Sequence, residues 1–193
     1  MKIKFIILTL VIFPIFNVAA QDKWVVDPSH SSIQFAIDHL VISEVTGSFN
    51  TFQGNLTMTG DDFTTAKLSG EIEANSVDTK NGQRDGHLKA PDFFDVANHP
   101  KITFESLSIK KVGDTKYSMK GKITIKGITK EITMEVIYKG TAKFMGQTKT
   151  GIKATGTIDR TEFGLKYSSM LETGGAVVGK EVEIILNFEL VKK

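Results

Sequence analysis

The chain contains no cysteine among its 193 residues. This absence excludes disulfide bonds, thiolate metal sites and cysteine nucleophiles. Arginine is almost as scarce, because lysine supplies nearly all of the positive charge and arginine occurs only as Arg84 and Arg160. The stability of the fold must therefore come from buried apolar surface and from backbone hydrogen bonds.

Residues 1–20 have the pattern of a secretory signal peptide. Lys2 and Lys4 precede an apolar stretch at 5–16, and small residues end at Ala20, where we expect cleavage. The apolar stretch is shorter than the roughly 20 residues that a membrane-spanning helix needs. No later stretch reaches that length, so we expect an exported mature chain without a transmembrane segment.

Charge of one sign does not predominate in the expected mature chain. Removing residues 1–20 leaves 193 − 20 = 173 residues, with 24 − 2 = 22 lysines and arginines against 22 acidic residues. A net charge of zero gives no electrostatic reason to expect binding to nucleic acid or to an anionic membrane surface. The length suits a single domain, which we expect to span residues 21–193.

Apolar and polar residues alternate along most of the chain after residue 23. This pattern is typical of antiparallel strands with one dry face and one wet face. Short turn signals separate the runs, so the pattern predicts an all-β fold of about eight strands, either a barrel or a sandwich. A closed barrel is favoured because closure removes exposed sheet edges. The clearest alternating runs are residues 32–37, 68–75, 117–125, 132–138, 152–158 and 182–190.

The segment at residues 82–100 differs from the strands around it. It contains one of the two arginines, two of the four histidines and a Phe-Phe pair. Residues 81–90 read as a short helix, because Asn81 can cap its start and Pro91 disfavours its continuation. We expect a helical insertion that frames or closes one end of a barrel.

The histidines do not have the spacing of a metal site. There is no His-x-x-x-His pair and no glutamate beside a histidine on a helix, although such short spacings usually announce zinc ligands. We therefore expect structural or hydrogen-bonding histidines, with no metal and no cofactor. The four are His30, His39, His87 and His99.

A catalytic alternative uses Arg84, Asp85 and His87 for acid–base chemistry on a small substrate in the exported space. Two residues apart on a helix, Asp85 and His87 do not face one another, and the chain has no Gly-x-Ser-x-Gly motif. The favoured interpretation is that Arg84 braces the segment, for example through Asp92 or Asp95. Recognition of an anionic head group by the planar guanidinium stays open as the alternative.

Phenylalanine is spread over nearly every expected element. The inside of a barrel of about eight strands can be filled by side chains or can hold one small ligand. Small residues at inward positions favour a cavity. They are Gly70, Ala74, Gly121, Ala154 and Gly156.

Several short motifs follow one another along essentially the whole mature chain. They are DPSHSSIQF at 27–35, GSF and FQG within 47–54, RDGHL at 84–88, FFD at 93–95, PKITF at 100–104, GKITIKG at 121–127, and DR and FG within 159–164. In this order and spacing they resemble the YceI-like family of exported bacterial proteins.

The resemblance implies an eight-stranded antiparallel lipocalin-like barrel with one or two short helices and an elongated apolar pore. It also implies a periplasmic or secreted location and the binding of polyisoprenoids or similar long amphiphilic lipids. We expect a protein that is not an enzyme and that holds such a lipid for transport or storage, with a homodimer as a further expectation. A purely structural envelope protein would need an exposed apolar patch, which the alternation does not indicate.

The expected lipid site has an apolar wall and a polar rim. Arg84 and His87 are expected at the mouth of the pore, where they would fix the head group of the lipid. The residues expected to line the pore are Phe35, Phe49, Phe52, Ile72, Phe93, Phe94, Phe104, Met119, Ile123, Met134, Phe163 and Phe188.

Overall fold

The computed structural model describes residues 21–167 and 177–193, so the expected signal peptide lies outside the described residues. Its strands are β1 (Asp22–Val26), β2 (Ser32–His39), β3 (Ser43–Phe49), β4 (Phe52–Thr59), β5 (Asp62–Glu73), β6 (Val77–Asp78), β7 (Lys101–Lys111), β8 (Lys116–Ile125), β9 (Ile128–Phe144), β10 (Gln147–Asp159) and β11 (Val178–Lys192). The helical elements are α1 (Gly82–Leu88) and three 3-10 turns, η1 (Pro28–His30), η2 (Ala74–Ser76) and η3 (Arg160–Phe163).

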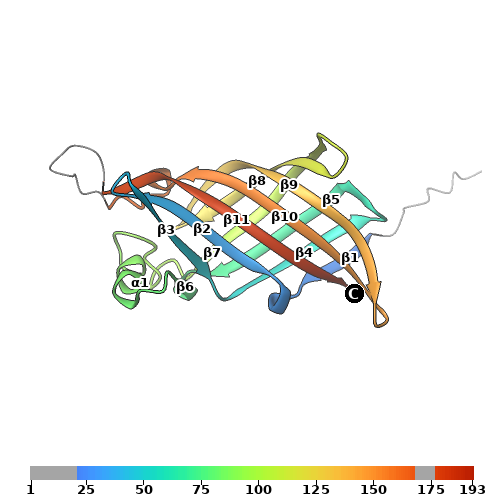
Figure 1. Cartoon of the computed structure of the whole chain (residues 1–193), viewed down its shortest axis with the longest axis horizontal. Helices are drawn as coiled ribbons and strands as arrows, with labels where there is room; N and C mark the ends of the chain where they lie inside the picture. Colours follow the sequence, from blue (N-terminus) through green and yellow to red (C-terminus); the bar gives the residue numbers. More distant parts are fainter. Residues whose placement is uncertain (1–20, 168–176) are drawn as a thin grey trace, which may run out of the picture.

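Eight antiparallel strands form a closed barrel (Figure 1). β1 and β2 are two parts of the first barrel strand, separated by η1, and β3 and β4 are two parts of the second. The wall continues through β5, β7, β8, β9, β10 and β11, and β11 returns to pair with β1. This closure places Trp24 opposite Lys192 and Val26 opposite Leu190. The predicted barrel is confirmed.

Alternation along each strand separates the inside of the barrel from the outside. In β8, Tyr117, Met119 and Ile123 are buried, whereas Lys120 and Lys122 between them are exposed. A period of two places successive side chains on opposite faces of the wall, so one face becomes apolar and the other stays hydrated.

One half of the barrel is filled by side chains. Phe63 is fully buried there, and its ring stacks on Tyr138 at 4.7 Å and meets Tyr117 edge-on at 5.0 Å. This half, which we call the closed end, lies beside the β4–β5 and β7–β8 turns. Its core residues are Trp24, Val26, Leu56, Met58, Phe63, Ala66, Ile109, Tyr117, Met119, Met134, Val136, Tyr138, Ile152, Ala154 and Leu190.

The opposite end of the barrel, which we call the mouth, carries the helical insertion. Figure 1 shows α1 and β6 beside this end, where the β2–β3 hairpin and the start of β11 also lie. Asn81 caps α1, since its side chain accepts a hydrogen bond from the backbone N–H of Arg84 at 3.1 Å. The predicted helix is therefore confirmed, although it ends at Leu88 rather than at residue 90. Within the described residues, no helix has the length and apolar character that crossing a membrane requires.

The filled closed end predicts different costs for two phenylalanines. Phe63→Ala should lower the free energy of unfolding by about 3–5 kcal/mol, because it leaves a cavity in the packed core. Phe144→Ala, at a side chain that is 63% exposed, should change it by less than about 0.5 kcal/mol. Urea unfolding of both variants measures the difference, and similar losses would contradict the description of the closed end as the stabilising core.

Candidate functional site

A cavity of about 350 Å³ occupies the half of the barrel nearer the mouth. Its wall runs from His39, Arg84 and Val177 at the mouth to Met119 and Leu190 at the edge of the filled core. The volume lies within the range of about 300–1,000 Å³ that is typical of ligand pockets. The barrel is therefore hollow on one side and solid on the other.

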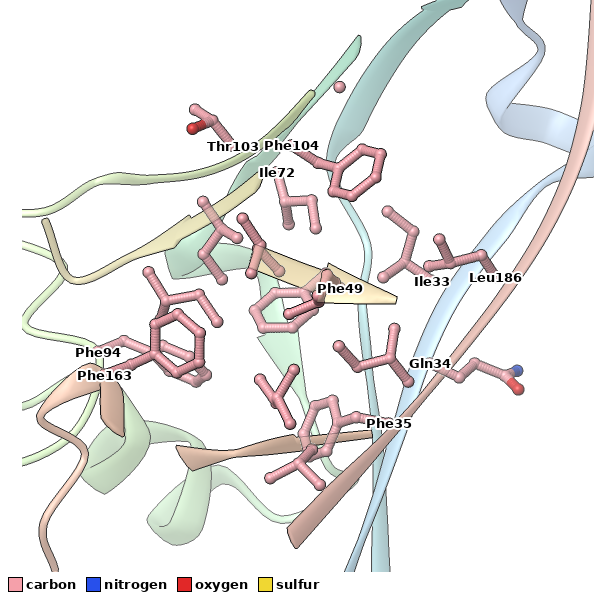
Figure 2. Close-up of a pocket in the computed structure, with 18 of the residues that line it drawn as sticks. Ile33, Gln34, Phe35, Phe49, Ile72, Phe94, Thr103, Phe104, Phe163 and Leu186 are labelled. Atoms are coloured by element: carbon pink, nitrogen blue, oxygen red, sulfur yellow. The ribbon is translucent and has the colours of Figure 1, made fainter. Parts of the chain in front are cut away.

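Aromatic rings form much of the cavity wall. Figure 2 shows Phe49 among Ile33, Phe35 and Ile72, while the Gln34 side chain points away. The Phe49 ring lies 5.8 Å from that of Phe35 and meets Phe94 edge-on at 5.6 Å. These contacts join the β2 and β3 strands to the helical insertion through apolar surface alone.

Eleven of the twelve residues expected to line the pore lie at the cavity wall, and their binding of a lipid stays a prediction. The exception is Phe52, which does not reach the cavity. Its half-buried ring packs against Phe188 at 6.0 Å, between the filled core and the cavity wall. The eleven are Phe35, Phe49, Ile72, Phe93, Phe94, Phe104, Met119, Ile123, Met134, Phe163 and Phe188.

The small inward residues contribute less space than the sequence predicts. Gly70 and Ala154 line the cavity. A Cβ at Gly121 would overlap the Phe104 ring, and one at Gly156 would lie 3.2 Å from the Met134 side chain. Larger side chains from neighbouring strands use the room at these two glycines, because cores pack without voids wherever a neighbour can reach.

Arg84 is braced, but not by the acids that the sequence suggests. Its Nε donates to Thr79 Oγ1 at 2.7 Å, and an Nη donates to the Thr79 carbonyl at 2.9 Å. Asp85 Oδ1 accepts from the Thr79 hydroxyl at 2.6 Å and from the Thr79 N–H at 2.9 Å. The expected pairing with Asp92 or Asp95 is wrong, because helical side chains lean toward the N-terminus of the helix and Arg84 therefore reaches back to the buried Thr79.

His87 belongs to a separate polar group at the mouth. Its Nε2 lies 2.7 Å from Asp92 Oδ2, and this hydrogen bond lowers the pKa of Asp92 below its ordinary value. The His87 ring also meets Phe93 and Tyr167 edge-on, at 4.9 and 5.0 Å. Arg84 and His87 both lie at the cavity wall, where the sequence places them, but they bond to different partners.

Arg160 also lies at the cavity wall, and the expected rim does not include it. The residue is only 5% exposed, and burial lowers the pKa of its guanidinium. It donates to three backbone carbonyls, of Leu165 at 2.6 Å, Gly179 at 2.7 Å and Val178 at 3.3 Å. Arg160 therefore ties η3 to the start of β11. The sequence does carry a signal for Arg160: it is one of only two arginines, and both stand where strand alternation breaks.

The hydrogen bonds at the mouth do not join Asp85 to His87 in the way that the catalytic alternative would use them. Asp85 bonds to Thr79 and His87 bonds to Asp92, so Asp85 does not orient His87. A carboxylate orients a catalytic histidine only when the two are hydrogen-bonded, and the carboxylate that bonds to His87 is Asp92. These contacts favour structural roles for Asp85 and His87.

A second cluster, on the outside of the barrel, has atoms suited to a metal ion. Ligand atoms of Asp27, His30 and Glu189 lie within 4.8 Å of one another beside η1. Lys149 Nζ lies 2.7 Å from Glu189 Oε1 and 3.9 Å from Asp27 Oδ2, so an ammonium group already balances the acids. The pKa of Asp27 is lowered to about 2, mainly by a hydrogen bond from the Ser29 hydroxyl and, to a smaller extent, by the hydrogen bond with His30. The cluster joins the break in the first barrel strand to β10 and β11.

The bridge through Thr79 predicts the effect of removing one hydroxyl. Thr79→Val keeps the shape of the side chain but removes the hydroxyl that bonds to Arg84 and Asp85, and should lower the free energy of unfolding by about 1–3 kcal/mol. Thr79→Ser keeps the hydroxyl and serves as the control in the same urea titration. A small loss in Thr79→Val beside a larger loss in Thr79→Ser would show that the methyl group, rather than the bridge, stabilises the segment.

Comparison with known proteins agrees with the geometry. The family model of the YceI-like domain matches residues 24–190. A UPF0312 protein of Staphylococcus aureus is 44% identical over 161 residues, which cover 81% of this chain and 90% of the relative.

Solved structures share the barrel. The YceI protein of Campylobacter jejuni has a TM-score of 0.68 at 30% identity, over 81% of this chain and 90% of its own. BcnA of Burkholderia cenocepacia has a TM-score of 0.73 at 22% identity, over 85% and 98%. A domain from Saccharophagus degradans, described as polyisoprenoid-binding, has a TM-score of 0.67 at 13% identity, over 88% and 98%. The last two show the fold alone. The match of the family model to nearly the whole described chain, together with the 44% identical relative, establishes that this chain belongs to the YceI-like family.

Proposed function

We propose that the chain binds a long-chain amphiphilic lipid, such as a polyisoprenoid, and holds it for transport or storage. The cavity of about 350 Å³ with its aromatic and aliphatic wall carries the proposal. Burial of a hydrocarbon chain in such a wall contributes about 0.8 kcal/mol per CH₂ group, before the cost of ordering the chain. The description of the Saccharophagus degradans domain as polyisoprenoid-binding supports the same ligand class.

The head group of the lipid is proposed to lie at the mouth beside Arg84 and His87. Both residues line the cavity, and the Arg84 guanidinium has N–H groups beyond the two that bond to Thr79. One or two polar contacts are enough to orient an amphiphile whose affinity comes from its chain. Arg84 would then both brace the helical segment and bind the head group, since its contacts with Thr79 fix the orientation of the guanidinium.

Export of the chain and a homodimeric state stay predictions. Export is supported by the basic, apolar and small-residue order of residues 1–20. Fractionation of the host cell, with a cytoplasmic and a periplasmic marker enzyme, tests the location. Native mass spectrometry of protein purified from that host tests the cargo, because a lipid adduct should survive with the folded barrel, and protein that neither carries nor takes up lipid would contradict the proposed function.

Substitutions at two neighbouring positions on β5 distinguish binding inside the cavity from binding on the outer face of the barrel. Gly70 faces the cavity, and among the described residues other than its chain neighbours the only atom within 4 Å of a Cβ built there is the Gln53 carbonyl oxygen at 3.3 Å. Ser69 also borders the cavity, but it is exposed, and alternation along β5 turns its side chain to the outer face. Gly70→Leu should weaken the binding of a fluorescent long-chain lipid at least about tenfold, which corresponds to about 1.4 kcal/mol, because the new side chain occupies ligand space. Ser69→Leu adds the same side chain outside and should leave the affinity within about twofold. Equal affinities of the two variants in a displacement titration would place the lipid elsewhere.

A further inference from the structure

The tip of the β2–β3 hairpin exposes two large apolar side chains at the mouth. Val41 is 72% exposed and Ile42 is 85% exposed. Figure 1 shows this hairpin at the same end of the barrel as α1 and the start of β11. We call residues 40–42 the tip. Strand alternation did not indicate an exposed apolar patch, because the tip lies in a turn.

The backbone of the tip is strained. The N–H of Ile42 donates to the His39 carbonyl at 3.3 Å, and the two residues between them have positive φ, 56° at Leu40 and 65° at Val41. Two positive φ angles are the property of type I′ turns, which prefer Asn-Gly because other residues adopt this conformation at a cost. For a β-branched residue such as Val41 the conformation is a genuine outlier.

Other tight hairpins of the same chain carry less of this strain. In the β8–β9 and β9–β10 turns one non-glycine residue at positive φ, Lys126 or Met145, is followed by a glycine, and in the β4–β5 turn the residue with positive φ is Gly60. The tip is the one of these four turns in which two consecutive non-glycine residues, Leu40 and Val41, have positive φ. Strain that is concentrated in this turn indicates that its side chains have a use.

Residues that flank the tip also line the cavity. His39 and Val45, which lie on either side of the tip, line the cavity. The N–H of Leu40 donates to the carbonyl of Val177 at 2.9 Å, and Val177 also lines the cavity. A surface that covers the tip therefore lies against the mouth.

Exposed apolar residues at turns are common and do not by themselves indicate a partner. The β9–β10 turn, at the closed end, exposes Phe144 at 63% and Met145 at 87%. That turn contains Gly146 and lies away from the mouth. It provides a matched control, since it has similar exposed apolar area at the end of the barrel that the cavity does not reach.

We propose that the tip inserts into the surface of a lipid bilayer and holds the mouth against it. This inference rests on the proposed function, because it explains how a lipid passes between bilayer and cavity without crossing water. Insertion removes Val41 and Ile42 from water, which is the same driving force that binds amphipathic segments to bilayers. Asp38 and Glu44 pair directly across the hairpin below the tip, and both are exposed. Two acids at that level favour a zwitterionic surface over an anionic one, and the hydrophobic contact should be insensitive to salt.

Flotation with phosphatidylcholine vesicles tests the docking surface. The full mature chain should float with the vesicles, and Val41→Asn/Ile42→Ser should lower its partition coefficient at least about tenfold. Asparagine tolerates positive φ, so Val41→Asn alone should keep the melting temperature or raise it by about 2–4 °C, which excludes unfolding as the cause of lost binding. The control, Phe144→Ser/Met145→Ser, should keep the partition coefficient within about twofold.

Four results would overturn the inference. The first is a wild-type chain that does not float, and the second is an equal loss of binding in the tip variant and the control. The third is binding that grows with anionic lipid and disappears in high salt. The fourth is a tip variant that changes the oligomeric state in sedimentation, because a second copy would then cover the tip. Failure of the proposed function is a different result: vesicle binding through the tip by a chain that takes up no lipid would contradict the cargo and leave the docking surface intact.

Discussion

The pairing of β1 with β11 closes the sheet, and the rest of the structure depends on this closure. It gives both strands a neighbour on each side, so the wall satisfies its backbone hydrogen bonds around the ring. Eight strands enclose an interior that side chains can just fill or that can hold one small ligand. This chain does both, because it packs the half around Trp24 and Phe63 and leaves the half around Phe49 hollow.

The polar groups of the mouth stabilise the rim of the hollow half. Arg84 and Asp85 share Thr79, Arg160 donates to carbonyls beside η3 and β11, and His87 bonds to Asp92. Each of these groups satisfies backbone or side-chain partners where strand pairing ends, and buried polar groups without partners would be costly there. The rim is therefore held by its own hydrogen bonds.

The strands and the helical insertion were predictable because alternation, capping and turn chemistry are local signals. The same alternation placed most of the expected pore residues at the cavity, but it gave no means of seeing that Phe52 packs on Phe188 of β11 instead. Whether Gly121 leaves a void depends on strand register, which brings the Phe104 ring over it. The partners of Arg84 and Arg160 depend on which backbone groups the folded barrel ends leave unpaired, and no spacing in the sequence states that.

The packed closed end has a kinetic meaning for any molecule that occupies the cavity. A cavity with one opening is a dead-end channel, so binding and release use the same path in opposite directions, and the part of the ligand that enters first must leave last. A new ligand cannot push out the old one from behind, and exchange must pass through an empty state whose lifetime is set by dissociation. Residence time would then grow with the length of chain inserted, and the barrel would sort ligands by how long they stay rather than by how fast they arrive.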